Sequence, residues 1–371
     1  MKASDPIAGA MQSAVEAGVF PGAVLLVRLQ GAIRYHRAFG LTASAPLPEP
    51  AHRDTIYDLA SLTKPLATAT AVLCLVQDGS LSLDRTVQDC LPELQGCPVG
   101  GATIAHLLTH SSGLPAWRPF YERVAEQDKL QPGFLGSPAA KAYVLQLIGE
   151  EELLAPIGAQ AVYSDLGFML LGLLVERLTG RSLAAVVRER IYGPIKAEPL
   201  SFVPTEGAPP AFAASAIAPT EDDPWRGRML RGEVHDENAY ALGGVAGHAG
   251  LFGTAAAVLA VSGCWLDAVT GKPSLLRADL AQRSTSRQEI VSRSSWGLGW
   301  DSPSPPSSSG TKFSPRSFGH LGYTGTSLWV DPERELEVVL LSNRVHPTRK
   351  NEKIREFRPL IHDVIYKELI G

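Results

Sequence analysis

The sequence predicts an α+β protein, with an antiparallel sheet flanked by N- and C-terminal helices and an inserted, mostly helical lobe. Strand-like runs lie near both ends of the chain, whereas the middle consists of helical pieces separated by turns. The strand-like runs occupy residues 23–29, 32–39, 327–331 and 335–342. One sheet closed by the two ends, with the helical middle as a separate lobe, is the economical arrangement. We place the sheet lobe at 1–78 and 230–371, the helical lobe at 79–229, and a ligand cleft between them.

The N-terminal elements follow from their apolar spacing and their turn residues. Residues 6–18 have the pattern of an amphipathic helix. The two strands after it are joined by Gln-Gly at residues 30–31, a spacing typical of a tight hairpin. Residues 61–77 predict a helix, because Pro65 falls in its first turn, where a missing N–H costs little, and Gly79 follows its end.

The middle and C-terminal elements are bounded by glycine and by proline-rich segments. Residues 166–178 predict a strongly apolar helix that ends before Gly180. Residues 201–230 are rich in Pro and Ala and predict a long connection, and residues 302–317 predict a polar loop rich in Pro and Ser. A final helix is expected over residues 352–369.

Composition and charge exclude several classes of protein. Of the 371 residues, 45% are hydrophobic and 19% are charged, which is typical of a globular chain and not of a disordered one. The formal net charge of −4 predicts no nucleic-acid partner. No apolar run reaches the roughly 18 residues that a membrane span needs. The first residues contain no apolar leader, so we expect a cytoplasmic protein, or a periplasmic one if a leader has been removed.

Cysteine and metal patterns predict neither metal nor cofactor. The four cysteines are Cys74, Cys90, Cys97 and Cys264. We interpret them as incidental thiols because none forms a C-x-x-C pair, although Cys90 and Cys97 can bridge in an oxidising compartment. The zinc-binding pattern H-E-x-x-H and the nucleotide-binding pattern G-x-x-x-x-G-K-[ST] do not occur. The pattern G-x-S-x-G does not occur either, which argues against an ordinary α/β-hydrolase. His235, Asp236 and His248 form a much less favoured metal set.

The strongest catalytic signal is Ser61-x-x-Lys64 at the start of a predicted apolar helix. Residues three apart share a helix face, so the hydroxyl and the amine can meet. A nucleophilic serine needs a nearby base, and a lysine shielded from water loses its charge more easily. The helix N-terminus adds N–H groups that favour a developing oxyanion. The same letters at Ser309-x-x-Lys312 fall in the Pro/Ser-rich loop, where a solvated loop is the favoured interpretation.

The second signal is Tyr163-Ser164-Asp165, just ahead of the apolar helix. A tyrosine at a loop-to-helix junction can point its phenol into a cleft. As a phenolate it can take the serine proton and pass it to a leaving group. The alternative is a tyrosine that packs beside an Asp helix cap.

The third signal is His320-x-Gly322-Tyr323, at the opening of the C-terminal strand pair. Gly322 lets a substrate backbone approach, and the N–H groups of Tyr323 and Ser61 are the expected halves of an oxyanion hole. His248-Ala249-Gly250 is a rival match in a glycine-rich run. We rank it lower and expect His248 on a loop that lines the mouth of the cleft.

The order of these motifs resembles the layout of the penicillin-recognising serine hydrolases, which is S-x-x-K, then Y-x-N, then K/H-x-G. The most similar branch holds class C β-lactamases, D-alanyl-D-alanine carboxypeptidases and related esterases. Matching segments span nearly the whole chain, at 58–64, 81–84, 103–114, 163–168, 296–300 and 319–322. Residues 235–239, 247–252 and 318–343 look like a sub-branch that also occurs fused to cell-wall-sugar hydrolases, which implies a link with peptidoglycan.

The resemblance implies a β-lactamase/transpeptidase-like fold and a role for each matching residue. Ser61 would be the acylated nucleophile, and Lys64 and Tyr163 would share the proton transfers. The amides of Ser61 and Tyr323 would form the oxyanion hole. The expected substrate-binding residues are Asp165, His320, Gly322 and His248.

Two positions depart from the family pattern. Asp165 stands where the family has an amide, and near Lys64 its carboxylate would stabilise the ammonium form and raise the lysine pKa. Tyr163 would then carry more of the proton transfer. His320 stands where the family has a cation, and histidine is mostly neutral at pH 7. This loss of a carboxylate anchor predicts weak turnover of β-lactams and better activity on neutral esters or amides.

The sequence therefore predicts a serine hydrolase that cleaves an ester or amide through an acyl-enzyme. Esterase, D-amino-acid peptidase and weak β-lactamase activities are the open alternatives. The expected partner is a small-molecule or peptide substrate, with peptidoglycan-derived peptides among the candidates. The runner-up is a non-catalytic penicillin- or muropeptide-binding protein of the same fold, although a pure binder has no need of a nucleophile flanked by two bases.

Overall fold

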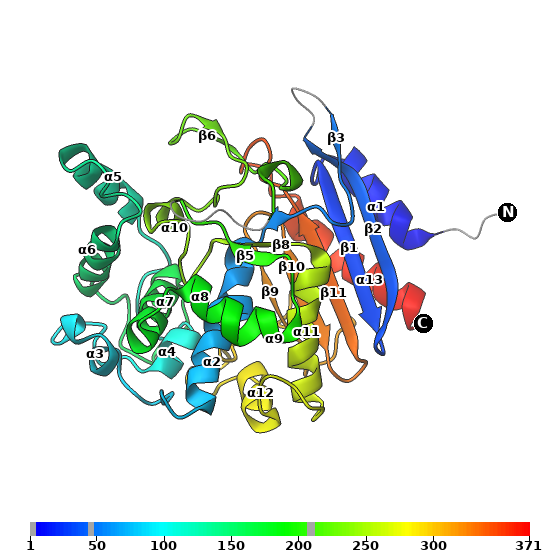
Figure 1. Cartoon of the computed structure of the whole chain (residues 1–371). Helices are drawn as coiled ribbons and strands as arrows, with labels where there is room; N and C mark the ends of the chain where they lie inside the picture. The colour runs from blue at the N-terminus through cyan, green and yellow to red at the C-terminus, as the bar shows by residue number, and fades with distance from the viewer. Residues whose placement is uncertain (1–4, 44–47, 206–211) are drawn as a thin grey trace.

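The computed structural model describes residues 5–43, 48–205 and 212–371 (Figure 1). Its largest sheet has six strands in the order β3-β2-β1-β11-β10-β9, and every neighbouring pair is antiparallel. The strands are β1 (Gly22–Leu29), β2 (Ala32–Ala43), β3 (Glu49–Pro50), β9 (Phe318–Leu321), β10 (Ser327–Asp331) and β11 (Leu336–Ser342). The two ends of the chain complete one sheet, as the sequence predicts. Its division into two lobes stays a prediction.

Strands β1, β10 and β11 are buried on both faces, and their alternate side chains point to opposite sides. In β1, Leu25 and Val27 pack with the terminal helices α1 (Pro6–Glu16) and α13 (Ile354–Leu369), whereas Val24 and Leu26 join the main core on the other face. The long helix α11 (Ala255–Val269) covers that other face beside β11 (Figure 1). These three strands are therefore mostly apolar in sequence, whereas β2 has many exposed residues and a mixed sequence.

The predicted hairpin between the first two strands is confirmed. Gln30 and Gly31 have φ angles of 52° and 77°. Two successive residues with positive φ form the turn that matches the twist of a two-residue hairpin. The N-terminal helix starts at Pro6 with the Asp5 side chain accepting the N–H of Ala8 at 2.8 Å. It ends at Glu16, two residues earlier than the sequence predicts.

Helices fill the middle of the chain, as predicted. They are α3 (Val87–Cys90), η3 (Pro92–Leu94), α4 (Ile104–Leu108), α5 (Phe120–Leu130), α6 (Pro138–Gly149), α7 (Asp165–Thr179), α8 (Leu183–Val187), η4 (Arg188–Tyr192) and α9 (Gly193–Ile195). Helix α7 is the apolar helix of the sequence, and Gly180 ends it with a φ of 65°. Later short helices are η5 (Ala214–Ala216), α10 (Glu237–Ala241) and α12 (Ala278–Thr285).

The predicted helix at 61–77 consists of three successive turns of different width. A tight 3₁₀ turn, η1 (Ala60–Leu62), leads into a wide π-helical turn, η2 (Lys64–Ala69), and then into α2 (Thr70–Gln77). Ala60 has a φ of 47°, the left-handed region that costs a side-chain-bearing residue free energy. Wide turns of this kind occur frequently at functional sites. The backbone changes from tight to wide between Ser61 and Lys64.

The segment predicted as a long connection contains short strands as well as loop. Its strands are β5 (Leu200–Phe202), β6 (Asp222–Asp223) and β7 (Arg228–Met229), and residues 206–211 of it lie outside the described part. Strand β5 pairs with β8 (Leu251–Gly253), which also pairs with β4 (Tyr57–Asp58). Strands of two or three residues are too short to show a period in the sequence, which explains why they were not predicted.

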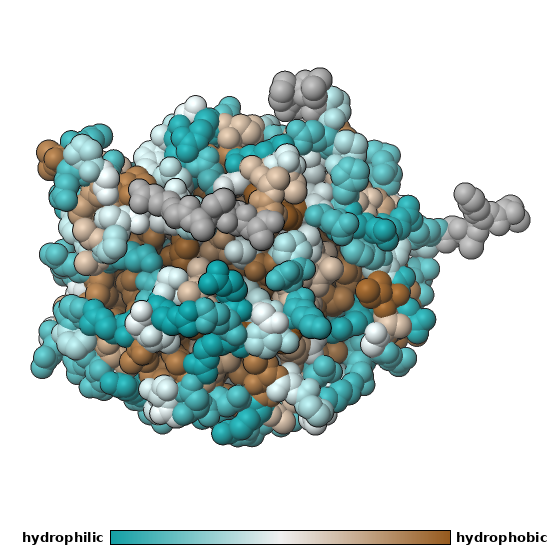
Figure 2. Space-filling view, in the orientation of Figure 1, coloured by the Kyte–Doolittle hydropathy of each residue, from teal (hydrophilic) through white to brown (hydrophobic). Residues whose placement is uncertain are grey.

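The remaining expectations concern thiols, loops and the surface. All four cysteines are free thiols, so Cys90 and Cys97 form no bridge. Residues 302–317 form an irregular loop, as predicted. Lys312 is exposed there, but Ser309 is buried, so the expectation that both are solvated is wrong for Ser309. No helix among the described residues is both long enough and apolar enough to cross a membrane. Hydrophilic side chains cover much of the face in Figure 2, with smaller apolar areas between them.

Candidate active site

A cavity of about 640 Å³ brings together predicted site residues from distant segments. The predicted residues that line it are Ser61, Tyr163, Asp165, His320, Gly322 and Tyr323. They come from η1, from the start of α7, and from β9 with the turn that follows it. The cavity also receives side chains from the loop before α10 and from α13.

Ser61 and Lys64 are in hydrogen-bond contact. The ammonium Nζ of Lys64 donates to Ser61 Oγ at 3.0 Å and forms an ion pair with Asp165 Oδ1 at 2.6 Å. The Lys64 side chain is 0% exposed, so its charge has no direct contact with solvent. Burial by itself lowers the pKa of Lys64, but the attraction of Asp165 and the contact with Tyr163 outweigh it and raise the lysine pKa. Lys64 is therefore held as a cation.

The backbone of the glycine-rich run fixes Lys64 from another side. The carbonyl of His248 accepts from Lys64 Nζ at 3.0 Å. The His248 side chain is 1% exposed and its Nε2 contacts Asp236 Oδ1 at 2.8 Å. We expected this side chain at the mouth of the cleft, but the structure turns it inward, where its ring contacts Asp236, a partly exposed residue that lines the cavity. The contact of His248 with the catalytic candidates is made by its main chain.

Tyr163 lies beside the lysine. Lys64 Nζ is 4.9 Å from the centre of the Tyr163 ring. Burial raises the pKa of Tyr163, while the charge of Lys64 and hydrogen bonding to Lys64 and Ser61 oppose the rise without cancelling it. The phenol is consequently protonated at neutral pH.

His320 belongs to a cluster of aromatic rings. Its ring centre lies 5.9 Å from that of Tyr163 and 5.7 Å from that of Trp296. Its Nδ1 contacts the carbonyl of Leu321 at 2.9 Å. Burial, with the repulsion of Lys64, lowers the pKa of His320 to about 3, so the ring is neutral at physiological pH. No permanent cation occupies this position.

The turn between β9 and β10 is tied to the segment that precedes Ser61. Thr324 Oγ1 donates to the carbonyl of Asp58 at 2.7 Å, and Thr326 Oγ1 donates to that of Leu59 at 3.0 Å. A side chain at Gly322 would meet Thr326 Oγ1 at 1.9 Å, so only glycine allows this approach. The N–H of Tyr323 finds no acceptor in the described part of the chain.

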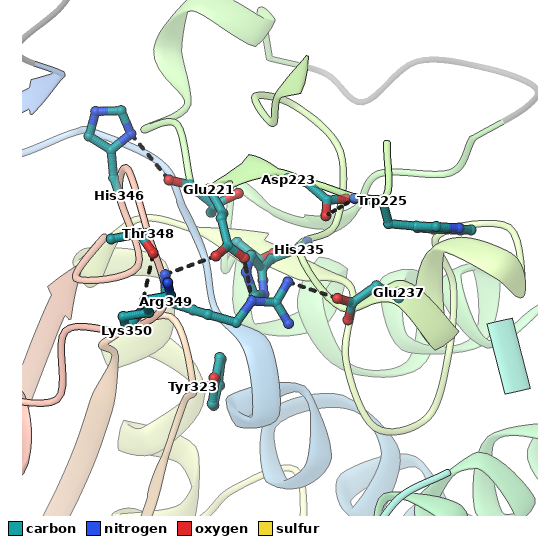
Figure 3. A network of polar contacts seen from close by, with 12 residues as sticks. Glu221, Asp223, Trp225, His235, Glu237, Tyr323, His346, Thr348, Arg349 and Lys350 are labelled. Carbon is teal, nitrogen blue, oxygen red and sulfur yellow. Dashed lines mark hydrogen bonds and ion pairs between the residues drawn. The ribbon is translucent and has the colours of Figure 1, made fainter. Parts of the chain in front are cut away.

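A polar network borders the cavity on the side of Tyr323 (Figure 3). Glu221 lies between His235, whose Nε2 is 2.9 Å from Oε2, and Arg349, whose backbone N–H donates to Oε1 at 2.9 Å. Arg349 also donates to Glu237 at 2.7 Å. These bonds outweigh the effect of burial and lower the pKa of Glu221 to about 2. The ring of Tyr323 stacks on His235 with ring centres 5.8 Å apart.

Metal ligation is not supported by the arrangement of these side chains. His235 faces Glu221, whereas His248 faces Asp236. The described residues contain no group of three or more His, Cys, Asp or Glu placed to hold a metal ion. The set of His235, Asp236 and His248 does not converge on one point.

Several residues at the cavity were not predicted as site residues. Trp296, from one of the segments that match the family, lines the cavity, and so does Trp117. The arginines of the cavity were missed, because a single Arg after a strand or on a helix resembles any surface Arg. They are Arg344, Arg349, Arg355 and Arg358.

A family model for beta-lactamases matches residues 7–362. The chain belongs to the beta-lactamase family. A protein of Escherichia coli (strain K12) named "Putative D-alanyl-D-alanine carboxypeptidase" is 33% identical over 353 residues, which is 88% of this chain and 79% of that protein. An "N-acetylmuramyl-L-alanine amidase" of Bacillus subtilis (strain 168) is 33% identical over 360 residues, with 88% and 78% covered.

A solved structure agrees with the fold. EstCE1, a hydrolase with promiscuous acyltransferase activity, aligns with a TM-score of 0.71 and 23% identity over 95% of this chain and 97% of its own. The predicted family resemblance and the α+β fold class are therefore confirmed. The family and these neighbours are hydrolases of the beta-lactamase fold.

Proposed function

We propose that this chain is a serine hydrolase that cleaves esters or amides through an acyl-enzyme on Ser61. One observation carries the proposal. A fully buried lysine, Lys64, places its Nζ 3.0 Å from Ser61 Oγ, and that serine lines a cavity of about 640 Å³. A hydroxyl that contacts a buried cation and borders a ligand-sized cavity has the surroundings of an activated nucleophile.

Lys64 acts in this proposal as a fixed cation. Because Asp165 raises its pKa, it does not readily release a proton at neutral pH. As an ammonium group it donates a hydrogen bond to Ser61 Oγ and stabilises the negative charge that develops there during attack. The carboxylate of Asp165 and the carbonyl of His248 hold the ammonium in place.

Tyr163 then relays the proton. Ser61 Oγ attacks the carbonyl carbon of the substrate, and its proton passes to the phenol oxygen of Tyr163 as the phenol proton passes to the leaving alcohol or amine. The new bond is the Ser61 ester, the broken bond is the one to the leaving group, and Tyr163 ends as it began. The N–H groups of Ser61 and Tyr323 stabilise the tetrahedral oxyanion.

Deacylation repeats this sequence with water. Water takes the place of the leaving group, gives its proton through Tyr163 to Ser61 Oγ, and releases the acid. The step needs no metal or cofactor in this proposal, because the side chains supply the nucleophile, the relay and the charge.

The substrate class follows from His320. The neutral ring leaves this position without a cation for a substrate carboxylate. Of the arginines in the cavity, Arg344 and Arg358 bind carbonyl oxygens of the chain, and Arg349 and Arg355 are paired with glutamates. We therefore propose neutral esters or amides as better substrates than penicillins. The name of the Bacillus subtilis relative, an amidase, supports an amide substrate, and the acyltransferase activity of EstCE1 supports an ester as the acyl donor. The Escherichia coli relative is named for a peptide that ends in a carboxylate, so we propose D-alanyl-D-alanine peptides as poorer substrates of this chain.

A substrate panel tests the proposal. Short-chain p-nitrophenyl esters, D-amino-acid p-nitroanilides and nitrocefin are compared with the wild type and with Ser61→Ala. We expect ester hydrolysis that Ser61→Ala abolishes, together with labelling of Ser61 by a fluorophosphonate. Nitrocefin hydrolysis with kcat/KM above roughly 10⁵ M⁻¹s⁻¹ would contradict the proposed substrate class. A wild type that neither hydrolyses the panel nor takes the label would contradict the hydrolase itself and favour a binding protein.

A further inference from the structure

Two arginines support the turn between β9 and β10 from inside the molecule. Arg344 follows β11, Arg358 lies on α13, and each is 6% exposed. Arg358 donates to the carbonyl oxygens of Gly322 at 2.9 Å and Thr326 at 2.7 Å. Arg344 donates through Nε to the carbonyl of Tyr323 at 2.8 Å. Both guanidinium groups thus bind carbonyl oxygens of one short turn.

Neither arginine is neutralised by direct contact with a carboxylate among the described residues. The other hydrogen bonds of Arg344 go to the carbonyls of Arg349 and Asn351. Nε of Arg358 is buried without a partner. Burial and the repulsion of Arg344 and Arg355 lower the pKa of Arg358 to about 9. A buried charge without an opposite charge costs free energy, so its position has to be explained.

Closing the turn does not explain Arg358. The carbonyl of Gly322 already accepts the N–H of Gly325 at 3.1 Å, and the carbonyl of Thr326 already accepts the N–H of Gly322 at 2.8 Å. The threonine hydroxyls tie the turn to residues 58 and 59. The guanidinium is therefore a second donor to carbonyls that the backbone has satisfied.

The Gly322 carbonyl and the Tyr323 N–H belong to the same peptide unit. Resonance across a peptide bond links its oxygen and its nitrogen, so a cation bound at the carbonyl draws electron density from the N–H. The N–H then becomes a stronger donor. In the proposed function this N–H faces the oxyanion, and it has no acceptor in the described chain.

We propose that Arg358 is a positioning residue that strengthens the oxyanion hole by binding the carbonyl of the Gly322–Tyr323 peptide. This inference rests on the proposed function. The positive charge orients the peptide and polarises its N–H, and it contributes most when the substrate oxygen becomes negative. Arg358 thereby lowers the barrier without touching the substrate.

Arg344 is the matched control. It is equally buried and donates to the same turn, but its acceptor, the Tyr323 carbonyl, belongs to the next peptide unit. Its guanidinium carbon also lies 4.4 Å from the Tyr323 ring centre. Arg344→Met likewise removes a donor to this turn, but it leaves the contact of Arg358 with the Gly322 carbonyl in place.

The test compares Arg358→Met, Arg358→Lys and Arg344→Met with the wild type on a p-nitrophenyl ester. Removal of one oxyanion donor costs about 10²–10³ in kcat, so we expect Arg358→Met to lower kcat about 30-fold with KM changed less than threefold. Arg358→Lys should recover at least half of the loss on a logarithmic scale. Arg344→Met should lower kcat less than threefold.

Infrared spectra of a ¹³C-labelled acyl-enzyme report the stretching frequency of its ester carbonyl, which a loss of folded protein alone does not change. A weaker oxyanion hole raises the stretching frequency of the ester carbonyl, so we expect a higher frequency in Arg358→Met and no change in Arg344→Met. Equal kcat losses and equal frequencies in the two Met variants would overturn the inference, as would an unchanged kcat in Arg358→Met. In those outcomes Ser61-dependent hydrolysis by the wild type stands. Wild-type protein without Ser61-dependent hydrolysis would overturn the proposed function and this role together.

Discussion

Two buried cations, Lys64 beside Ser61 and Arg358 beside the turn between β9 and β10, have different partners. Lys64 is paired with a carboxylate, Asp165 Oδ1, at 2.6 Å, whereas Arg358 binds only carbonyl oxygens among its described hydrogen-bond partners. The ion pair holds the lysine as a cation beside Ser61, the proposed nucleophile, which makes it a poor base. The arginine has no such partner, and in the role that we propose its charge acts on the Gly322–Tyr323 peptide. A paired cation thus orients a reacting atom, while an unpaired one polarises its neighbours.

Removal of the paired cation should have the largest effect. Lys64→Met takes away the donor to Ser61 Oγ and leaves the Asp165 carboxylate close to the nucleophile. Because that carboxylate would repel the developing oxygen anion, we expect kcat/KM for a p-nitrophenyl ester to fall at least ~10³-fold. A circular dichroism spectrum like that of the wild type controls for folding. A loss below tenfold would show that Lys64 does not act at Ser61.

Tyr163→Phe should have the next largest effect. With Lys64 held as a cation, the phenol is the group left to move the proton, and phenylalanine keeps the ring but removes the oxygen. We expect kcat to fall about 10²-fold or more. Trp296→Phe, which changes a neighbouring ring without an acid or base, is the control. If Tyr163→Phe keeps more than a tenth of the activity, the proton moves by another route.

Asp165→Asn breaks the ion pair and tests the charge of Lys64. The carboxylate raises the lysine pKa against burial, so the amide should let that pKa fall. If the ammonium is the working form, the decline of kcat/KM at high pH moves to lower pH, and activity at pH 9 falls about tenfold. The pH profile from 5 to 10 measures this shift. Higher activity at neutral pH, with the low-pH limb moved down, would identify the free amine as the base.

The smallest effect is expected for a change at His362, which alters the stability of the helix that carries Arg358. His362 lies one helical turn further along α13, with Nδ1 2.7 Å from the carbonyl of Arg358. Burial lowers its pKa from 6.5 to about 4, so its neutral form is favoured in the fold. This contribution to stability is complete above pH 6.5 and is lost as the pH falls towards 4.

Between pH 7 and pH 4, His362→Asn should therefore lose about 3 kcal/mol less unfolding free energy than the wild type. Urea denaturation at the two pH values measures the difference. Equal losses in His362→Asn and the wild type would show that the ring is already protonated or solvated in the folded protein.

The long apolar elements could be predicted from the sequence. Strand β10 matches its predicted bounds, and α7 and α13 lie within two residues of theirs, because apolar periods and stop signals such as Gly180 are local. The wide turn at Lys64 could not be predicted, since Ser61-x-x-Lys64 gives the same spacing on any helix. The small sheet of β4, β8 and β5 was missed because its pairing depends on segments nearly 200 residues apart.

The site was predictable where a motif carried it. The contact of Lys64 with Ser61 follows from their spacing, and the effect of Asp165 on the lysine pKa follows from charge once the two are close. The inward turn of the His248 side chain was not predicted, although the sequence grouped Asp236 with it as a candidate metal ligand, because a shared segment does not show which way a ring points. The same holds for Arg358, whose acceptors lie more than thirty residues away along the chain.

Intact-mass spectrometry shows whether Ser61 becomes acylated during turnover. The protein is mixed with a p-nitrophenyl ester and quenched in acid within milliseconds to seconds. Its intact mass is then measured, and the modified peptide is sequenced. We expect a transient gain of one acyl group on Ser61 that appears before turnover and is missing in Ser61→Ala. Turnover without any adduct, or an adduct on another residue with Ser61→Ala still active, would contradict it.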